Sequence, residues 1–231
     1  MAWQLSLDLP LAVALGPGDY ILSDANRAAH AMVMAEQGWP ERKLALIGAP
    51  GSGKSHLARL WQAESEAMVL QARALGPALP PPAPGAAIVV EDVDRLPREA
   101  EETLFHLHNR LAASGGRLLL TADRPPARLD IRLPDLASRL QATAVVRIED
   151  PDDRLLAAVL AKHFADRQLV PAADVIPYLA ARIERSFAAA AWAVERLDRM
   201  ALAEGRPVTR ALARRMLGGR ARLDNRPGGT R

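Results

Sequence analysis

Five short apolar runs alternate with helical patterns along the first two thirds of the chain, at residues 44–47, 68–70, 86–90, 118–120 and 144–148. Continuous apolar runs of this length are typical of strands that are buried on both faces. Because helical patterns separate them, they predict a parallel sheet with helices on both faces. None of the runs approaches the length of a membrane span.

From residue 151 onward the pattern is helical only, and helices are predicted at residues 152–167, 174–183, 186–204 and 209–217. An earlier helix is predicted at residues 25–37, with Asp24 as its cap and with Gly38 and Pro40 beyond its end. The prolines of LGPALPPPAPG, between the second and third runs, predict a surface loop. We therefore expect an α/β domain at residues 20–150 and a small all-helical domain at residues 151–219.

Composition narrows the class of protein. Of the 231 residues, 49% are hydrophobic, which is enough for a substantial core. The absence of cysteine excludes disulfides and cysteine-ligated zinc, and the five histidines lack a metal-binding spacing. No Lys or Arg precedes the apolar stretch at residues 9–15, so we expect no signal peptide and a soluble, cytoplasmic protein. The net charge is only +3, and residues 220–231 predict a disordered basic tail, so no general nucleic-acid-binding surface is indicated.

The strongest chemical motif is LALIGAPGSGKSHLARL, which contains G-x-x-x-x-G-K-[ST] between a strand pattern and a helix pattern. In such a loop the backbone N–H groups surround a phosphate chain, the lysine reaches the β- and γ-phosphates, and the hydroxyl holds Mg²⁺. We predict a site for ATP or ADP with Mg²⁺. The predicted nucleotide-binding residues here are Gly48, Gly51, Ser52, Gly53, Lys54, Ser55 and His56.

An acidic strand end, AAIVVEDVD, supplies the second element of such a site. Glu91 and Asp92 follow the apolar run, where parallel sheets place ligands, and with Ser55 they are the predicted magnesium ligands. In the usual order Asp comes first, near the metal, and Glu second, polarising water; here the order is reversed and the second carboxylate is a methylene shorter. Because phosphoryl transfer depends on positioning, we expect weak hydrolysis by this chain alone.

Two later stretches, LLLTADRPP and LPDLASRL, complete an order of motifs that resembles the nucleotide-binding module of bacterial DnaA replication initiators, a branch of the AAA+ ATPases. The resemblance covers about residues 20–218 and implies a P-loop AAA+ α/β module followed by a helical lid. It implies that Thr121 and Asp123 form the first sensor and that Arg139 is an arginine finger acting in trans. Such fingers raise rates by about 10³–10⁵. Taken without the resemblance, an arginine near a helix end is more often a surface ion pair.

The second sensor of this family, an arginine on a lid helix, aligns with Ala188. Arg185 lies one helical turn earlier in that alignment. Two alternatives stay open at this point: either Arg185 contacts the same phosphate, or the contact is lost.

The first segment, MAWQLSLDLP, alternates leucine with polar residues, which fits either an edge strand or a binding peptide within residues 1–19. Its Q-L-x-L-x-L pattern resembles the peptide with which Hda-like, DnaA-related proteins bind the DNA-polymerase sliding clamp. The predicted clamp-binding residues are Gln4, Leu5, Ser6, Leu7 and Leu9. About a dozen residues follow Leu217, which we expect to be too few for the DNA-binding module of an initiator.

Together these features predict an Hda-like negative regulator of replication initiation. It would bind the clamp, self-associate, and stimulate hydrolysis of DnaA-bound ATP. We expect it to contact DNA only through the clamp and to bind no membrane. The alternatives are a self-contained AAA+ ATPase such as a helicase loader, and a DnaA-like initiator paralogue. A P-loop kinase fits less well, because the sensor and finger motifs have no role in it.

Overall fold

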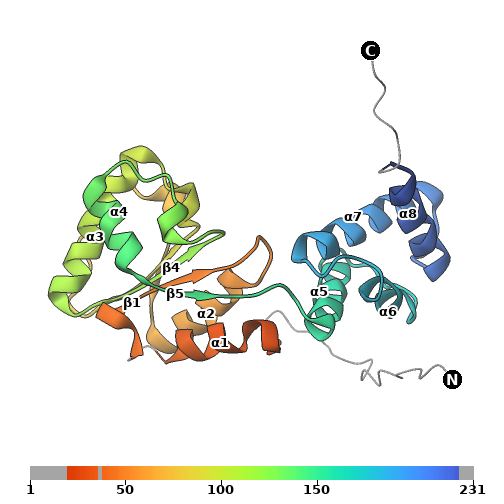
Figure 1. Cartoon of the computed structure of the whole chain (residues 1–231), viewed down its shortest axis with the longest axis horizontal. Coiled ribbons are helices and arrows are strands. Elements are labelled where there is room, and N and C mark those ends of the chain that lie inside the picture. The colour runs from red at the N-terminus through yellow and green to blue at the C-terminus, as the bar shows by residue number, and fades with distance from the viewer. Residues whose placement is uncertain (1–19, 36–37, 224–231) are drawn as a thin grey trace, which may run out of the picture. The chain divides into compact units, whose positions relative to one another are not determined.

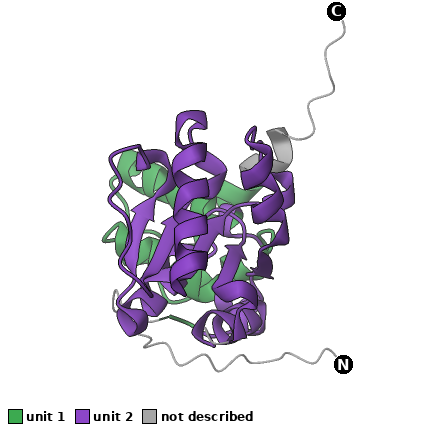
Figure 2. Ribbon diagram, turned by 90° about the vertical axis from the view of Figure 1, so that its left-hand side faces the viewer, with its two compact units in different colours: residues 1–21, 156–185, 189–231 green, residues 22–155, 186–188 purple. Residues whose placement is uncertain are grey.

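The computed structural model of the chain describes residues 20–35 and 38–223. The predicted clamp-binding residues therefore lie outside the described residues. The chain divides into two compact units (Figure 2). The sheet unit holds Leu22–Leu155 and Ser186–Ala188, and the helical unit holds Leu156–Arg185 and the chain from Ala189 onward.

The sheet unit is built on five parallel strands, which confirms the predicted α/β fold class (Figure 1). Their bounds are Lys43–Ile47 (β1), Met68–Gln71 (β2), Ala87–Glu91 (β3), Arg117–Ala122 (β4) and Ala144–Arg147 (β5). Each lies within two residues of its predicted run. The strand order is β2-β3-β4-β1-β5, so β4 lies between β3 and β1, both of which precede it along the chain.

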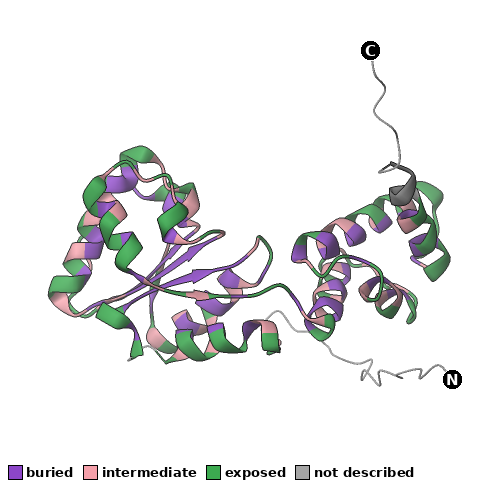
Figure 3. Cartoon of the chain, viewed as in Figure 1, coloured by how far each residue is buried: buried purple, intermediate pink, exposed green. Residues whose placement is uncertain are grey.

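Helices cover both faces of this sheet (Figure 1). They are Asp24–Met34 (α1), Lys54–Ser65 (α2), Glu101–Ser114 (α3) and Pro134–Ala142 (α4). Leucines of α3 and α4 share one apolar core with alternate residues of β1, β3 and β4, while α1 and α2 pack against the other face. Figure 3 shows the strands as the most buried part of this unit. Short 3-10 turns occupy Pro40–Arg42, Ala72–Ala74, Val93–Arg95, Arg98–Ala100 and Pro126–Arg128.

The first helix begins one residue earlier than predicted, and Asp24 is not its cap. Ser23 has extended backbone angles and precedes the helix, and its N–H donates to Asn26 Oδ1 at 2.9 Å. The Asn26 side chain turned back in this way stabilises the start of the helix. Asp24 is instead the first helical residue, where a carboxylate favours the positive end of the helix dipole. The helix ends at Met34, before the predicted end at residue 37.

Four helices follow the sheet at the predicted positions: Asp153–Asp166 (α5), Val175–Ala180 (α6), Phe187–Glu204 (α7) and Arg210–Leu223 (α8). The helical unit holds all of them except the first residues of α5 and α7. Its core includes Leu156, Phe164, Leu179, Leu197 and Leu212. Helix α8 continues to Leu223, so the predicted disordered tail does not begin at residue 220; the Ala and Arg residues of this stretch are good helix formers. No helix in the described ranges is long and apolar enough to cross a membrane.

Candidate nucleotide-binding site

The loop between β1 and α2 has the backbone geometry that its glycines predict. Gly53 precedes α2 with φ +94°, a left-handed conformation that glycine adopts without strain. At Gly48 a Cβ atom would lie 2.6 Å from Ser52 Oγ and 3.2 Å from the Ile148 carbonyl oxygen. A side chain there would displace the Ser52 hydroxyl and crowd the Ile148 carbonyl, so the close packing of the loop at this position favours glycine.

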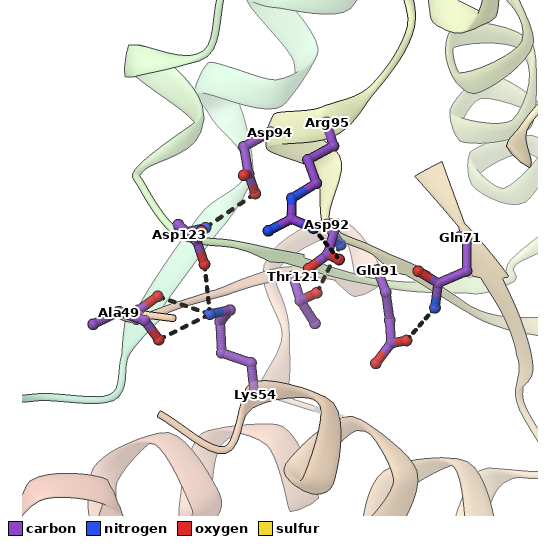
Figure 4. A network of polar contacts seen from close by, with 10 residues as sticks. Ala49, Lys54, Gln71, Glu91, Asp92, Asp94, Arg95, Thr121 and Asp123 are labelled. Atoms are coloured by element: carbon purple, nitrogen blue, oxygen red, sulfur yellow. Dashed lines mark hydrogen bonds and ion pairs between the residues drawn. The ribbon is translucent and has the colours of Figure 1, made fainter. Parts of the chain in front are cut away.

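Lys54, the first residue of α2, points back into this loop (Figure 4). Its Nζ donates to the carbonyl oxygens of Gly48 at 2.8 Å and Ala49 at 3.1 Å, and to Asp123 Oδ1 at 2.8 Å. The lysine side chain is only 8% exposed. An ammonium group has three donors, so all of them are used inside the protein. A phosphate bound in the loop would take one or more of these donors from their present acceptors.

Sheet order explains why Lys54 meets Asp123, which is 69 positions away in the chain. Strand β4 lies beside β1, and Ile47 pairs with Ala122. The loop after β1 and the residue after β4 therefore lie at the same edge of the sheet, where parallel strands place their ligand sites. The structure brings together the predicted P-loop lysine and the predicted first-sensor aspartate.

Glu91, at the end of β3, is buried at 6% exposure and accepts a short hydrogen bond from Gln71 Nε2 at the end of β2 (Figure 4). Its other carboxylate oxygen, Oε1, is buried without a partner among the described residues. A buried carboxylate oxygen with no donor is the kind of ligand that Mg²⁺ prefers. Glu91 therefore fits the predicted magnesium role.

Asp92 and Thr121 are linked through the backbone. Asp92 has φ +57°, and its N–H donates to Thr121 Oγ1 at 3.0 Å. Its carboxylate is 3.9 Å from Arg95 Nη1, a surface contact. Asp94 Oδ1 accepts the N–H of Asp123 at 3.1 Å and so fixes the backbone beside Lys54.

Two contributors to this site were not predicted from the sequence. Gln71 ends an edge strand, and Asp94 lies within a 3-10 turn. Gln71 belongs to no motif, and Asp94 is the last residue of AAIVVEDVD, in which only Glu91 and Asp92 were predicted to act. Both are polar residues at or just after the carboxyl end of an apolar run. Such residues become candidates once the neighbouring strand is known.

The residues of the loop also fit a bound phosphate chain. Ser52 is buried, and its Oγ has no hydrogen-bond partner among the described residues. Helix α2 is 12 residues long and begins at the loop, so the first N–H groups of the helix and its positive dipole end point toward the same place. Ser55 and His56 follow Lys54 in the first turn of this helix.

Two further predicted site residues, Arg185 and Arg139, lie on other parts of the chain. Arg185 precedes α7 rather than lying within it, so it is not one helical turn before Ala188 on that helix as expected. It belongs to the helical unit, and Ala188 is grouped with the sheet unit. Arg139 lies on α4 and is exposed.

The charge of Arg139 acts on two buried basic residues, Lys43 and His108. Its charge lowers the pKa of Lys43, which begins β1, although burial is the larger cause of that shift and Glu41, 3.6 Å away, opposes it. Burial, followed by the charges of Lys43 and Arg139, lowers the pKa of His108 on α3 to about 4. The guanidinium carbon of Arg139 lies 6.0 Å from the ring centroid of Phe105.

Comparison with known proteins identifies the fold. No protein-family model matches the chain. The structure is similar to domain III of the replication initiation protein DnaA from Thermotoga maritima, with a TM-score of 0.64 and 19% identity over 87% of this chain and 94% of that one. AMPPCP-bound DnaA from Aquifex aeolicus matches with a TM-score of 0.55 and 19% identity, over 80% of this chain and 64% of that chain.

A RuvB variant from Thermotoga maritima is also similar, with a TM-score of 0.53 and 15% identity over 77% of this chain and 61% of that chain. The chain thus spans less than two thirds of this RuvB chain and of the Aquifex DnaA chain. The parallel sheet with its following helices is therefore similar in fold to DnaA domain III and to RuvB.

Proposed function

We propose that this protein is an Hda-like regulator of replication initiation, which binds the sliding clamp through its first residues and stimulates hydrolysis of DnaA-bound ATP through Arg139. The position of Arg139 carries this proposal. The arginine is exposed on α4, and among the described residues no carboxylate forms an ion pair with it. An exposed guanidinium without a carboxylate partner is available to an anion from outside the chain.

The chain's own P-loop is too far away to be that partner. The charge of Arg139 acts on Lys43, at the start of β1, whereas the P-loop follows Ile47 at the other end of the strand. Four steps at about 3.3 Å each separate these ends by about 13 Å. In the sheet unit Arg139 therefore lies toward the start of β1, at the opposite end of this strand from the chain's own P-loop. A finger that acts in trans contacts the nucleotide of another chain, so this position supports the proposal.

The P-loop supports a second part of the proposal. Lys54 and the N–H groups of the loop would hold the phosphates of ATP or ADP, while Ser55 and Glu91 would hold Mg²⁺. Bound nucleotide would supply the charge that replaces Asp123 as the partner of Lys54. The reversed order of Glu91 and Asp92 supports slow hydrolysis by this chain itself.

The clamp-binding part of the proposal is supported by the sequence pattern at Gln4–Leu9. Burying its three leucines would contribute roughly 5–9 kcal/mol. Association costs about 4–15 kcal/mol, so one such peptide binds weakly. Two peptides on a self-associated protein would gain by avidity on a ring-shaped clamp. We therefore propose that the protein acts as a homodimer or a larger assembly.

The test is the conversion of DnaA-bound ATP to ADP in the presence of clamp loaded on DNA. Arg139→Ala should remove most of the stimulation, by a factor of up to about 10³ or more. Arg139→Lys should restore little of it, because a point charge lacks the planar fork that spans two phosphate oxygens. Arg196→Ala is the matched control, since Arg196 is an exposed arginine on α7. Equal rates for wild type and Arg139→Ala would refute the role of this residue.

A second candidate function is a self-contained AAA+ ATPase, such as a helicase loader, or an initiator paralogue. The observation that favours it is the well-formed site around Lys54, where Asp123 and Glu91 are already in place. Steady-state hydrolysis by the purified protein distinguishes the two. A turnover of tens per second without partners would favour the self-contained ATPase.

A further inference from the structure

A basic and aromatic surface lies on α6 and α8 of the helical unit and contains none of the predicted site residues. Tyr178 on α6 carries two guanidinium groups over its ring: the guanidinium carbon of Arg182 is 4.2 Å from the ring centroid, and that of Arg210 on α8 is 5.0 Å from it. Helices α6 and α8 pack together in this unit. The ring therefore makes cation–π contacts with two guanidinium groups at once.

Arg214 extends this surface by one helical turn. It is exposed and lies four positions after Arg210 on α8, so the two side chains occupy the same face of the helix. We call Tyr178, Arg182, Arg210 and Arg214 the arginine face. Its one carboxylate contact is that of Asp174, whose Oδ2 is 3.9 Å from Arg210 Nη1.

The charged residues of the segment around Arg210 are all positive. Residues 205–223 contain six arginines, no lysine and no acidic residue. Arginine alone, rather than a mixture with lysine, is typical of surfaces that bind phosphate, because the planar guanidinium donates two parallel hydrogen bonds to two oxygens.

The polar character of the arginine face favours nucleic acid over a protein partner. Among the residues whose exposure is described, the exposed large apolar ones are Leu22, Met32, Met68, Val145, Val170 and Leu202, and none of them lies on α6 or on α8 up to Gly218. Protein interfaces generally have an apolar centre, whereas nucleic-acid interfaces are polar and strongly positive.

We infer that the arginine face binds the phosphate backbone of duplex DNA without regard to sequence. Two guanidinium groups already lie against the Tyr178 ring, so a base of single-stranded nucleic acid that stacked where they lie would have to displace them. This inference goes beyond the proposed function, in which DNA is met only through the clamp, and it does not depend on Arg139 or on the terminal peptide.

The test is fluorescence anisotropy of the full chain with a labelled 30-base-pair duplex, titrated between 50 and 200 mM salt. Each phosphate contact adds about 0.9 to the slope of log affinity against log salt, so three contacts add about 2.7. Over this fourfold rise in salt, the affinity of the wild type should therefore fall about 40-fold more than that of a variant without these contacts. We expect Arg182→Ala/Arg210→Ala/Arg214→Ala to bind more weakly at 50 mM salt and to show the shallower slope.

A charge-matched control separates the face from the net charge of the protein. Arg73, Arg128 and Arg196 are exposed arginines outside the face, and the triple change Arg73→Ala/Arg128→Ala/Arg196→Ala removes the same charge. We expect this variant to retain most of the wild-type slope. Equal losses in the two triple variants would overturn the inference.

Two further measurements keep the result decisive. Arg214→Glu changes one exposed residue outside the core, so it should weaken duplex binding with an unchanged melting temperature even if the triple variant folds poorly. A labelled poly-glutamate peptide is titrated in parallel. If Arg214→Glu leaves duplex binding unchanged, the arginine face does not contact DNA and the inference is overturned. If the wild type binds poly-glutamate as tightly as duplex, and Arg214→Glu weakens both equally, the inference is overturned in favour of an acidic protein partner.

Discussion

Buried His108 makes the stability of the sheet unit depend on pH, with a sign and size that follow from its surroundings. The residue is 2% exposed on α3, and its Nδ1 has no hydrogen-bond partner among the described residues. Burial and the charges of Lys43 and Arg139 lower its pKa from 6.5 to about 4. The native protein therefore resists protonation at a residue that the unfolded chain protonates readily.

The expected loss of stability occurs on acidification below pH 6.5. Because the unfolded state binds the proton first, the free energy of unfolding falls as the pH drops from 6.5 toward 4, and the His108 contribution is complete above 6.5. From pH 6.5 to pH 5 the cost accumulates at about 1.36 kcal/mol per pH unit, which gives about 2 kcal/mol at pH 5.

Urea unfolding at pH 7.5 and pH 5 measures this effect when wild type is compared with His108→Leu, which cannot be protonated. We expect the wild type to lose about 2 kcal/mol more than the variant between the two pH values. His163, whose pKa is also lowered by burial, acts equally in both proteins and cancels in the comparison. An equal pH dependence in the two proteins would refute the assignment of His108 as a buried neutral residue.

Three further outcomes are expected. Lys54→Ala should weaken ADP and ATP binding roughly 10- to 100-fold in titration calorimetry, because it removes the charged donor aimed at the phosphates; unchanged affinity would place the nucleotide elsewhere. The isolated protein should hydrolyse ATP slowly and hold ADP as stably as ATP, and a radiolabelled turnover assay would contradict this with rates of tens per second. Gln4→Ala/Leu5→Ala/Leu7→Ala should abolish retention on immobilised clamp with nearly the same melting temperature; a loss of several degrees would mean that these leucines belong to a strand.

The sequence by itself determined the elements and the chemistry of the phosphate loop. Continuous apolar runs could only be buried strands, and the glycines around Lys54 could only serve a loop with left-handed and closely approached backbone. The reversed order of Glu91 and Asp92 was likewise evident from the sequence alone. These features are local, since each depends on residues within a few positions of one another. The predicted start of α1 was wrong by one residue. Ser23 is the residue before the helix, and its N–H is capped by the Asn26 side chain, so Asp24 is not the cap.

Only the tertiary structure decided which of these residues meet. Placing β4 beside β1 brings Asp123 to Lys54, and placing β2 beside β3 brings Gln71 to Glu91. The same packing puts Arg139 at the opposite end of β1 from the P-loop. Parallel strands are joined by long connections, so their order depends on how whole helices pack over the sheet and leaves no short-range pattern in the chain. For that reason the sequence named the candidate residues of the proposed nucleotide site, whereas their contact partners and the separation of Arg139 from them came from the fold.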